Sequence, residues 1–328
     1  MSVPGPGPGH HPDPDPDPDH DPTSTVRFPS DALDRLARAF PGRVGIYIEA
    51  VCSEVAGGAR YAFAADERFP TASVFKIPVL LTLYQLAEAG RLSLDDRHRV
   101  AADISTHGTG ILKQFTDAPE LSLRDHCRIM ISHSDNIATD TIIRAVGLDQ
   151  INAMLERQGL ANTRVPMEIG RWHYVMAGMD RAPLNLANDD EMVRRAKAGE
   201  VDDDGLAFSD RLENLVASPR DLAALVGRID QGKLAGAAAT ESMRQMLRLG
   251  DGPITSVLQP NVAAQTMSKR GSSRRIVCDV ALVPLAAGPL VISVMTLEDQ
   301  PRKSGTALIG EVTRLAVGAV DPDALAAD

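Results

Sequence analysis

The pattern of hydrophobic and polar positions separates a strand-rich frame from a helical middle. Five segments have the pattern of strands, at 43–51, 59–66, 261–269, 275–284 and 289–297. Segments with helical spacing flank them, from about residue 30, from Ser218 to Ile229, near 239–249 and at 304–319. Because runs of strands joined by tight turns form antiparallel sheets, the pattern predicts one such sheet flanked by helices, an α+β fold.

Between the two groups of strands the spacing is mainly helical, over residues 71–214. Residues 165–217 lack a clean period, which predicts a long loop with short helical pieces, and long ordered loops are often functional. We expect one lobe that contains the sheet, made of 30–70 and 215–328, and a helical lobe made of 71–214. A cleft between two lobes is a common place for an active site.

The first 29 residues are rich in Pro, Gly and Asp and predict a disordered tail, because this composition cannot bury apolar surface. Three tail histidines stand among the aspartates, at His10, His11 and His20. They could bind a metal ion weakly, but a solvated tail without a function is the simpler interpretation. We therefore expect no metal and no cofactor.

Composition narrows the partners and the compartment. The chain has 328 residues, 44% of them hydrophobic, which is enough for a sizeable core. A formal net charge of −10 argues against binding to nucleic acid or to an anionic membrane surface. No apolar run is long enough to span a membrane, and the N-terminus lacks the basic head and apolar middle of a secretory signal. We expect a cytoplasmic protein.

The cysteine pattern predicts neither a disulfide framework nor a metal site. The chain has three cysteines, Cys52, Cys127 and Cys278, and they are odd in number and widely spaced. This pattern speaks against a disulfide framework and against a zinc site. Cys278 falls within an apolar strand pattern, where a buried, inert thiol is expected.

The segment "TASVFKIPVL" carries the first candidate chemistry. Ser73 and Lys76 are three residues apart at the start of an apolar helical run, so their side chains share one face. Burial lowers the pKa of an amine, and a neutral amine can accept a serine proton. The alternative is a capping serine followed by a lysine that reaches out to solvent.

Two further motifs favour the chemical interpretation. Ser134, Asp135 and Asn136 form an S-D-N triplet, and a K-x-G triplet, Lys269 to Gly271, ends a predicted strand. Each triplet alone is common in turns and helix caps. The order S-x-x-K, S-D-N, K-x-G along one chain is much more specific.

With these motifs the sequence resembles the class A β-lactamases and related penicillin-recognising serine hydrolases. The segments "GTGIL", "SDNIATDTIIRAVG", "ASPRDLAALV" and "CDVALV" add to the resemblance, which covers about residues 30–320. It implies the β-lactamase (DD-peptidase) fold, with a five-stranded antiparallel sheet and an all-helical lobe. It also implies that Ser73 is the acylated nucleophile, with Lys76 as its proton acceptor or as the group that orients a water molecule.

The resemblance assigns roles to the other motif residues as well. Ser134 would pass a proton to the leaving nitrogen, and Asn136 would hold Lys76 and the substrate amide. Lys269 would set the electrostatics of Ser134 and attract an anionic group. The oxyanion would be bound by two backbone N–H groups, one from Ser73 and one just past Gly271, at Ser273.

The sequence departs from the family pattern in two places. Arg270 replaces a small hydroxyl residue, and we expect it to bind a carboxylate or phosphate of the substrate, the alternative being a solvated hairpin arginine. The usual E-P-x-L-N loop glutamate has no clear counterpart. Glu168 in "TRVPMEIGRW" is close to the expected place, while "RAPLN" has Ala182 where the acid would be. Glu168 is therefore either a repositioned catalytic base or a solvated loop residue.

Three hypotheses follow. The leading one is a serine hydrolase that forms an acyl-enzyme on Ser73 and hydrolyses a β-lactam or another amide or ester, weakly as a β-lactamase. Its substrate would be a small acyl compound with an anionic group. The second is a cytoplasmic biosynthetic acyltransferase or cyclase on the same fold. The third is a non-catalytic binding protein.

Overall fold

The computed structural model of the chain describes residues 26–51, 58–101, 108–301 and 304–327. Cys52 and the predicted tail up to residue 25, with its three histidines, lie outside the described residues. The longer strands are β1 (Gly42–Ala50), β2 (Arg60–Phe63), β7 (Met267–Ser273), β8 (Ile276–Leu285) and β9 (Gly288–Glu298). The short strands are β3 (Phe69–Pro70), β4 (Arg97–Arg99), β5 (Glu120–Ser122) and β6 (Val216–Ala217).

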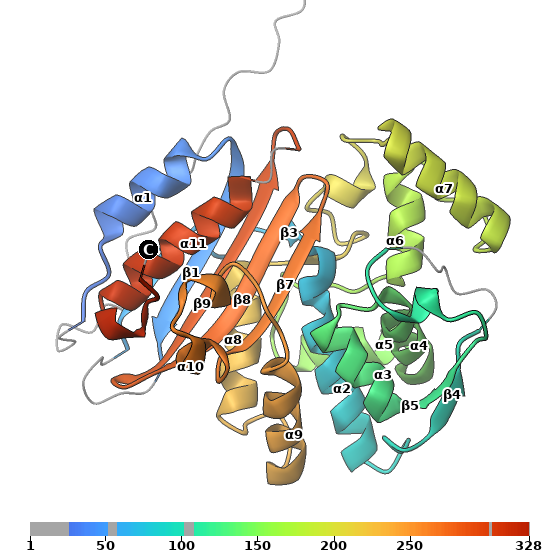
Figure 1. Cartoon of the computed structure of the whole chain (residues 1–328), viewed down its shortest axis with the longest axis horizontal. Coiled ribbons are helices and arrows are strands. Elements are labelled where there is room, and N and C mark those ends of the chain that lie inside the picture. Colours follow the sequence, from blue (N-terminus) through green and yellow to red (C-terminus); the bar gives the residue numbers. More distant parts are fainter. Residues whose placement is uncertain (1–25, 52–57, 102–107, 302–303, 328) are drawn as a thin grey trace, which may run out of the picture.

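The long strands form the predicted five-stranded antiparallel sheet, in the order β2-β1-β9-β8-β7 (Figure 1). The first two strands and the last three join because β1 pairs with β9 over its whole length, from Gly42 opposite Glu298 to Ala50 opposite Leu290. The order leaves β7 at one edge of the sheet. This edge strand carries the K-x-G triplet.

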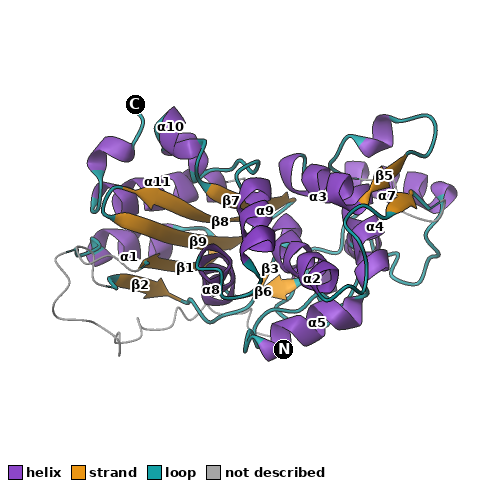
Figure 2. Cartoon of the chain, turned by 90° about the horizontal axis from the view of Figure 1, so that it is seen from below, coloured by secondary structure: helices purple, strands orange, loops and turns teal. Residues whose placement is uncertain are grey.

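Helices cover both faces of the sheet. Helices α1 (Ser30–Ala39) and α11 (Ser304–Gly318) pack on one face and α8 (Pro219–Asp230) on the other, as Figures 1 and 2 show together. Helix α8 begins as its sequence predicts, with Ser218 accepting a hydrogen bond from the backbone N–H of Asp221 and Pro219 in the first turn. The β8 and β9 strands are apolar almost throughout because both of their faces are covered.

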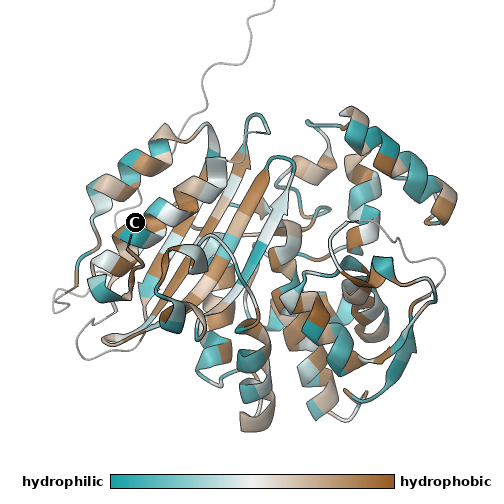
Figure 3. Ribbon diagram, in the orientation of Figure 1, coloured by the Kyte–Doolittle hydropathy of each residue, from teal (hydrophilic) through white to brown (hydrophobic). Residues whose placement is uncertain are grey.

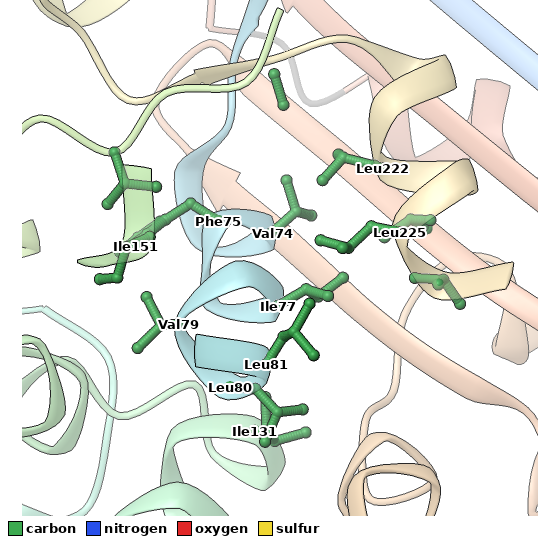
Figure 4. Close-up of a cluster of buried hydrophobic side chains, with 14 of the residues drawn as sticks. Val74, Phe75, Ile77, Val79, Leu80, Leu81, Ile131, Ile151, Leu222 and Leu225 are labelled. Atoms are coloured by element: carbon green, nitrogen blue, oxygen red, sulfur yellow. The ribbon is translucent and has the colours of Figure 1, made fainter. Parts of the chain in front are cut away.

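The rest of the chain is mainly helical. The remaining helices are α2 (Lys76–Glu88), α3 (Leu123–Ser132), α4 (Asn136–Val146), α5 (Leu148–Arg157), α6 (Ile169–Met176), α7 (Leu186–Ala198), α9 (Ala237–Leu247) and α10 (Pro260–Ala263). Helix α2 is apolar on nearly every side because it is buried in the middle of the molecule. Figure 4 shows Leu80 of α2 near Ile131 of α3, with Ile151 of α5 on one side of α2 and Leu222 and Leu225 of α8 on the other.

The hydropathy of the ribbon follows this arrangement. In Figure 3 the central strands are mostly hydrophobic, whereas α7 shows hydrophilic residues along much of its length. Helix α7 buries only Asp189 and Met192, and it packs with α6 through a small separate cluster that includes Tyr174 and Met179. The first and last parts of the segment 165–217 thus contribute to the central core, through residues such as Trp172 and Phe208, whereas α7 lies outside it.

Two expectations from the sequence need correction. The segment 261–269 was expected to be a strand throughout, but its first part belongs to α10, which begins with Pro260, and β7 starts only at Met267. Proline suits the first turn of a helix, since it has no N–H to donate and its φ is already helical. The irregular segment 165–217 contains a full helix of 13 residues, α7, where only short pieces were expected.

Candidate active site

Ser73 lies on a single 3₁₀ turn, η1 (Ala72–Phe75), directly before α2. The preceding residue, Ala72, has a φ of +43°, in the left-handed region that is costly for a residue with a side chain. The turn is held in place because Val74 and Phe75 are fully buried and the N–H of Thr71 donates to the carbonyl of Leu215. Ser73 itself remains partly exposed, as its predicted role of nucleophile requires.

Lys76 connects this turn to the S-D-N triplet. Its side chain is buried, and Nζ donates to the carbonyl oxygen of Ser134 at 2.7 Å, to Ser134 Oγ at 3.1 Å and to Asn136 Oδ1 at 2.9 Å. Burial lowers the pKa of Lys76 well below its usual value, and the nearby charge of Lys269 lowers it further. A neutral amine next to a serine can act as a proton acceptor.

Ser134 lies between two lysines. Lys269 Nζ is 3.1 Å from Ser134 Oγ, the same distance as Lys76 Nζ, and it also donates to the carbonyl of Arg270 at 3.0 Å. Burial lowers the pKa of Lys269 to about 8. The backbone of Ser134 has a φ of +50°, so the chain takes a sharp turn just before α4 in order to present this hydroxyl. The three nonadjacent motifs meet at one oxygen atom.

Asp135 holds the triplet to the glycine-rich segment before it. Its Oδ1 accepts from the N–H of Ala138 and caps α4, while Oδ2 accepts from Ile111 at 2.7 Å and Leu112 at 2.9 Å. Gly110 must be a glycine here, because a side chain at its φ of +127° would overlap the Asp135 carboxylate. The triplet and the segment 108–112 therefore form one rigid piece.

Gly271 is where the edge strand β7 approaches the serine. A Cβ atom on Gly271 would lie 2.5 Å from the carbonyl oxygen of Thr71 and 2.7 Å from the backbone nitrogen of Ser73, closer than real contacts allow. The glycine thus keeps open the space in front of the N–H of Ser73. This space is where an oxyanion would be bound.

The second N–H donor can be assigned from the alternation of the strand. The carbonyl of Arg270 accepts from Lys269 Nζ, so it faces the site and not the neighbouring strand β8. Backbone groups two residues apart on a strand point the same way, which puts the N–H of Ser272 on that side. The geometry favours Ser272 over the predicted Ser273, whose Oγ contacts Met176 Sδ at 3.8 Å.

Arg270 lies on the other face of β7 from Lys269. Its side chain is 55% exposed, and its Nε is 3.5 Å from Asp251 Oδ1, a residue that is 76% exposed. Both residues line a pocket of about 360 Å³ at this edge of the sheet. The next two arginines are already engaged, since Arg274 forms a double ion pair with Asp203 and Arg275 donates to the carbonyls of Asp203 and Glu298.

Glu168 is held by α4. It stands directly before α6, and its carboxylate forms two hydrogen bonds with Arg144, from Nε at 2.8 Å and from Nη2 at 3.0 Å. Arg144 is two helical turns beyond Asn136, about 12 Å along the axis of α4. The role of Glu168 as a base stays a prediction. Ala182 packs beside α6 and α7, and Asn185 of "RAPLN" caps α7.

Asp140 is a site residue that the sequence analysis did not single out. It is buried one turn after Asn136, and its two oxygens accept from the N–H groups of Ile169 at 2.8 Å and Gly170 at 2.9 Å. Burial raises its pKa to about 7, and Glu168 contributes in the same direction. The signal was present in "SDNIATD", because position i+4 on a helix lies on the same side as the motif asparagine.

Other kinds of site find no support in the described residues. No group of three His, Cys, Asp or Glu side chains among them is placed to hold a metal ion. Cys127 and Cys278 are buried as free thiols, and burial raises the pKa of each to about 12. Among the helices of the described ranges, none has both the length and the apolar character required to cross a membrane.

Comparison with known proteins agrees with this geometry. Residues 29–320 match the model of the β-lactamase enzyme family. A β-lactamase of Amycolatopsis lactamdurans is 27% identical over 298 residues, 87% of this chain and 83% of that protein. The β-lactamase L2 of Stenotrophomonas maltophilia is 31% identical over 127 residues, which are 38% of this chain and only 40% of that protein.

Solved structures show the same fold. The β-lactamase of Sphaerobacter thermophilus has a TM-score of 0.69 at 27% identity, with 89% of this chain and 97% of that chain covered. A variant of PBP-A, in an acyl-enzyme complex with penicillin G, has a TM-score of 0.70 at 22% identity over 88% and 95% of the two chains. The chain belongs to the β-lactamase enzyme family and is a serine hydrolase of amide or ester bonds.

Proposed function

We propose that the protein acts through an acyl-enzyme on Ser73 and hydrolyses a β-lactam or another amide or ester. The observation that carries the proposal is the position of Ser134 Oγ, 3.1 Å from each of two buried lysine Nζ atoms. Burial lowers the pKa of Lys76 well below its usual value, which favours a neutral amine that can accept a proton, whereas Lys269, with a pKa of about 8, stays mostly protonated at pH 7 and keeps its positive charge beside Ser134.

These contacts support the following steps of acylation. Lys76 takes the proton of Ser73 Oγ as the oxygen attacks the substrate carbonyl carbon. The N–H groups of Ser73 and Ser272 stabilise the oxyanion, since Gly271 leaves the space in front of Ser73 open. The amide or ester bond breaks when the proton reaches the leaving atom through Ser134. Lys269 stabilises the negative charge that develops on the Ser134 oxygen as it passes the proton on.

The substrate is a small acyl compound with an anionic group. Lys269 and Arg270 supply positive charge on the two faces of β7, and Asn136 offers an amide for the substrate's own amide. Removal of the acyl group is the slower half of the reaction, because Glu168 is engaged with Arg144. A protein of this kind would hydrolyse β-lactams weakly.

Intact-mass analysis with a panel of penicillins, cephalosporins, activated esters and a phosphonate tests this proposal. At least one reagent should add its acyl or phosphonyl mass to the protein, and the Ser73→Ala variant should show no adduct. The variant Ser132→Ala, in which a hydroxyl bonded to the carbonyl of Arg128 is removed from α3, is the matched control and should label normally. Equal labelling of Ser73→Ala and the wild type would contradict the assignment of the nucleophile.

A further inference from the structure

Helix α6 runs beside the site from one lobe to the other. At its start, the N–H groups of Ile169 and Gly170 bond to Asp140 of α4. At its end, Met176 contacts Ser273, the last residue of β7. Ile169, His173 and Met176 are at positions i, i+4 and i+7, which share one face of a helix. His173 is thus on the face of α6 that contacts α4 and β7, the elements that carry Asn136 and Lys269.

The contacts of Gly108 place the imidazole next to Asn136. Gly108 has a φ of +94°, and a Cβ atom added to it would overlap Asn136 Nδ2 and lie 3.1 Å from His173 Cε1. Cε1 is the ring carbon between the two nitrogens, so the nitrogen-bearing edge of the ring faces the same space as the Asn136 amide. Asn136 in turn accepts from Lys76.

Glu168 and His173 therefore differ in what they face, although both belong to the segment 165–217. Glu168 is bonded to Arg144, two turns along α4 from Asn136. His173 is partly exposed and lies on the Asn136 side. An unperturbed imidazole is mostly neutral at pH 7 and can accept a proton, which makes it a suitable general base.

We propose that His173 is the general base that resolves the acyl-enzyme on Ser73, a step that rests on the proposed function. A water molecule between His173 and the ester gives its proton to the imidazole as its oxygen bonds to the acyl carbon. The tetrahedral adduct then releases Ser73 Oγ, which regains a proton from the imidazolium, directly or through Lys76. The product leaves as a carboxylic acid, and the histidine returns to its neutral form.

The charged and titratable groups around the ring come from four elements. Lys76 on α2 bonds to Asn136, Asp140 on α4 bonds to the N–H of Ile169 in α6, and Glu168 directly precedes α6. On the fourth side, Lys113 Nζ donates to the carbonyl of Gly108. The pH dependence of this step will therefore report the coupled titration of several residues, and mutation of His173 removes one of them.

The test follows formation and decay of the acyl-enzyme from a p-nitrophenyl ester, by release of p-nitrophenol and by intact mass. His173→Asn should acylate within about twofold of the wild type, while decay slows by roughly 10²–10³ and depends less on pH between about 5 and 8 than in the wild type. In His173→Ala, added imidazole should restore decay, which no structural role would produce. His98→Asn, a histidine change on the small β4–β5 hairpin, should change neither rate.

The outcomes separate this inference from the proposed function. If Ser73 is acylated and decays at the wild-type rate with the wild-type pH profile in His173→Asn, the inference is wrong and the proposed function stands. The inference is likewise wrong, and the proposed function stands, if Glu168→Gln accumulates the acyl-enzyme and imidazole fails to rescue His173→Ala. Should the variants not fold, a pH-independent decay of the wild type between about 5 and 8 overturns the inference. No adduct on the wild type with any reagent overturns both.

Discussion

The cluster around Ser134 and the segment 165–217 are held in place in different ways. In the cluster, side chains from α2, from β7 and from the turn before α4 meet, and the lysines that bind Ser134 Oγ are both buried. The segment is attached mainly at its ends. Asp140 and Arg144 hold its first part to α4, and Arg274 and Arg275 hold its far part at Asp203 to the β7–β8 turn.

This difference suggests that the two halves of the reaction depend on separate parts of the molecule. In the proposed mechanism, the groups that form the acyl-enzyme are held by the packing of the core. The groups available to resolve it lie on the segment 165–217, which Asp140, Arg144, Arg274 and Arg275 hold to the rest of the molecule. Variants in the cluster should therefore reduce acylation, and variants in the segment or its anchors should act on the later step.

The largest effect is expected for Ser134→Ala, which removes the hydroxyl between the two lysines. Acylation should slow by roughly 10²–10⁴, the usual contribution of a positioned acid–base group. Stability should change little, since Ser134 is partly exposed. Burst kinetics with an amide substrate and a thermal melt would measure both. Unchanged amide turnover would mean that the proton does not pass through Ser134.

Gly271→Ala should have the next largest effect, because its Cβ atom would push against the backbone of Thr71 and Ser73. Acylation should fall by about 10²–10³, as expected for loss of one oxyanion donor. Gly227→Ala on α8 is the matched control, since its Cβ atom would meet only Val291 Cγ2 at an ordinary 3.8 Å. Equal rates for the two variants would show that the Ser73 N–H is not used.

Much of this comparison was available from the sequence. The motif order predicted that Ser73, Ser134 and Lys269 would meet, although each pair is separated by dozens of residues. The resemblance carried that prediction, because neither spacing nor propensity specifies which distant segments pack together. The five-stranded antiparallel sheet was predicted correctly for the same reason. Local rules also located the start of α8, where Ser218 and Pro219 act within a few residues of each other.

The remaining features depend on contacts that a single sequence does not encode. The environment of Glu168 depends on Arg144, which is 24 positions away in the sequence and bonds to its carboxylate. The importance of Asp140 depends on the N–H groups of α6 that it accepts from. His173 is separated from Gly108 by more than 60 positions, and only tertiary packing brings them together. The period of 165–217 is hard to read because α6 is short and mostly buried, whereas α7 buries only Asp189 and Met192.

The variant Asp140→Asn tests the contact that holds the start of α6 to α4. The folded state raises the pKa of Asp140 to about 7 from 3.8, so between these values the unfolded chain binds fewer protons and the wild type loses stability as pH rises. The variant does not titrate there. Relative to the wild type, its free energy of unfolding should therefore rise between pH 4 and 7, by on the order of 1–3 kcal/mol, and level off above.

Urea unfolding of both proteins at several pH values would measure this difference, with Asp149→Asn at the exposed start of α5 as the control. Acylation of Ser73 should be nearly unchanged in Asp140→Asn, whereas decay of the acyl-enzyme should slow severalfold because α6 loses one of its two backbone anchors. A difference in stability that stays flat with pH would show that Asp140 is ionised in the folded protein throughout this range.

The smallest effect is expected for Arg270→Thr, at the edge of the cluster. Arg270 and Asp251 are both well exposed, so their ion pair contributes little and a substrate carboxylate can replace Asp251. KM for anionic substrates should rise about tenfold, the size of one charge-assisted hydrogen bond, while kcat and neutral substrates are unaffected. Asp251→Asn should act in the opposite direction and lower KM for the same anionic substrates. An equal change for neutral and anionic substrates would mean that Arg270 shapes the edge of β7 and does not bind the carboxylate.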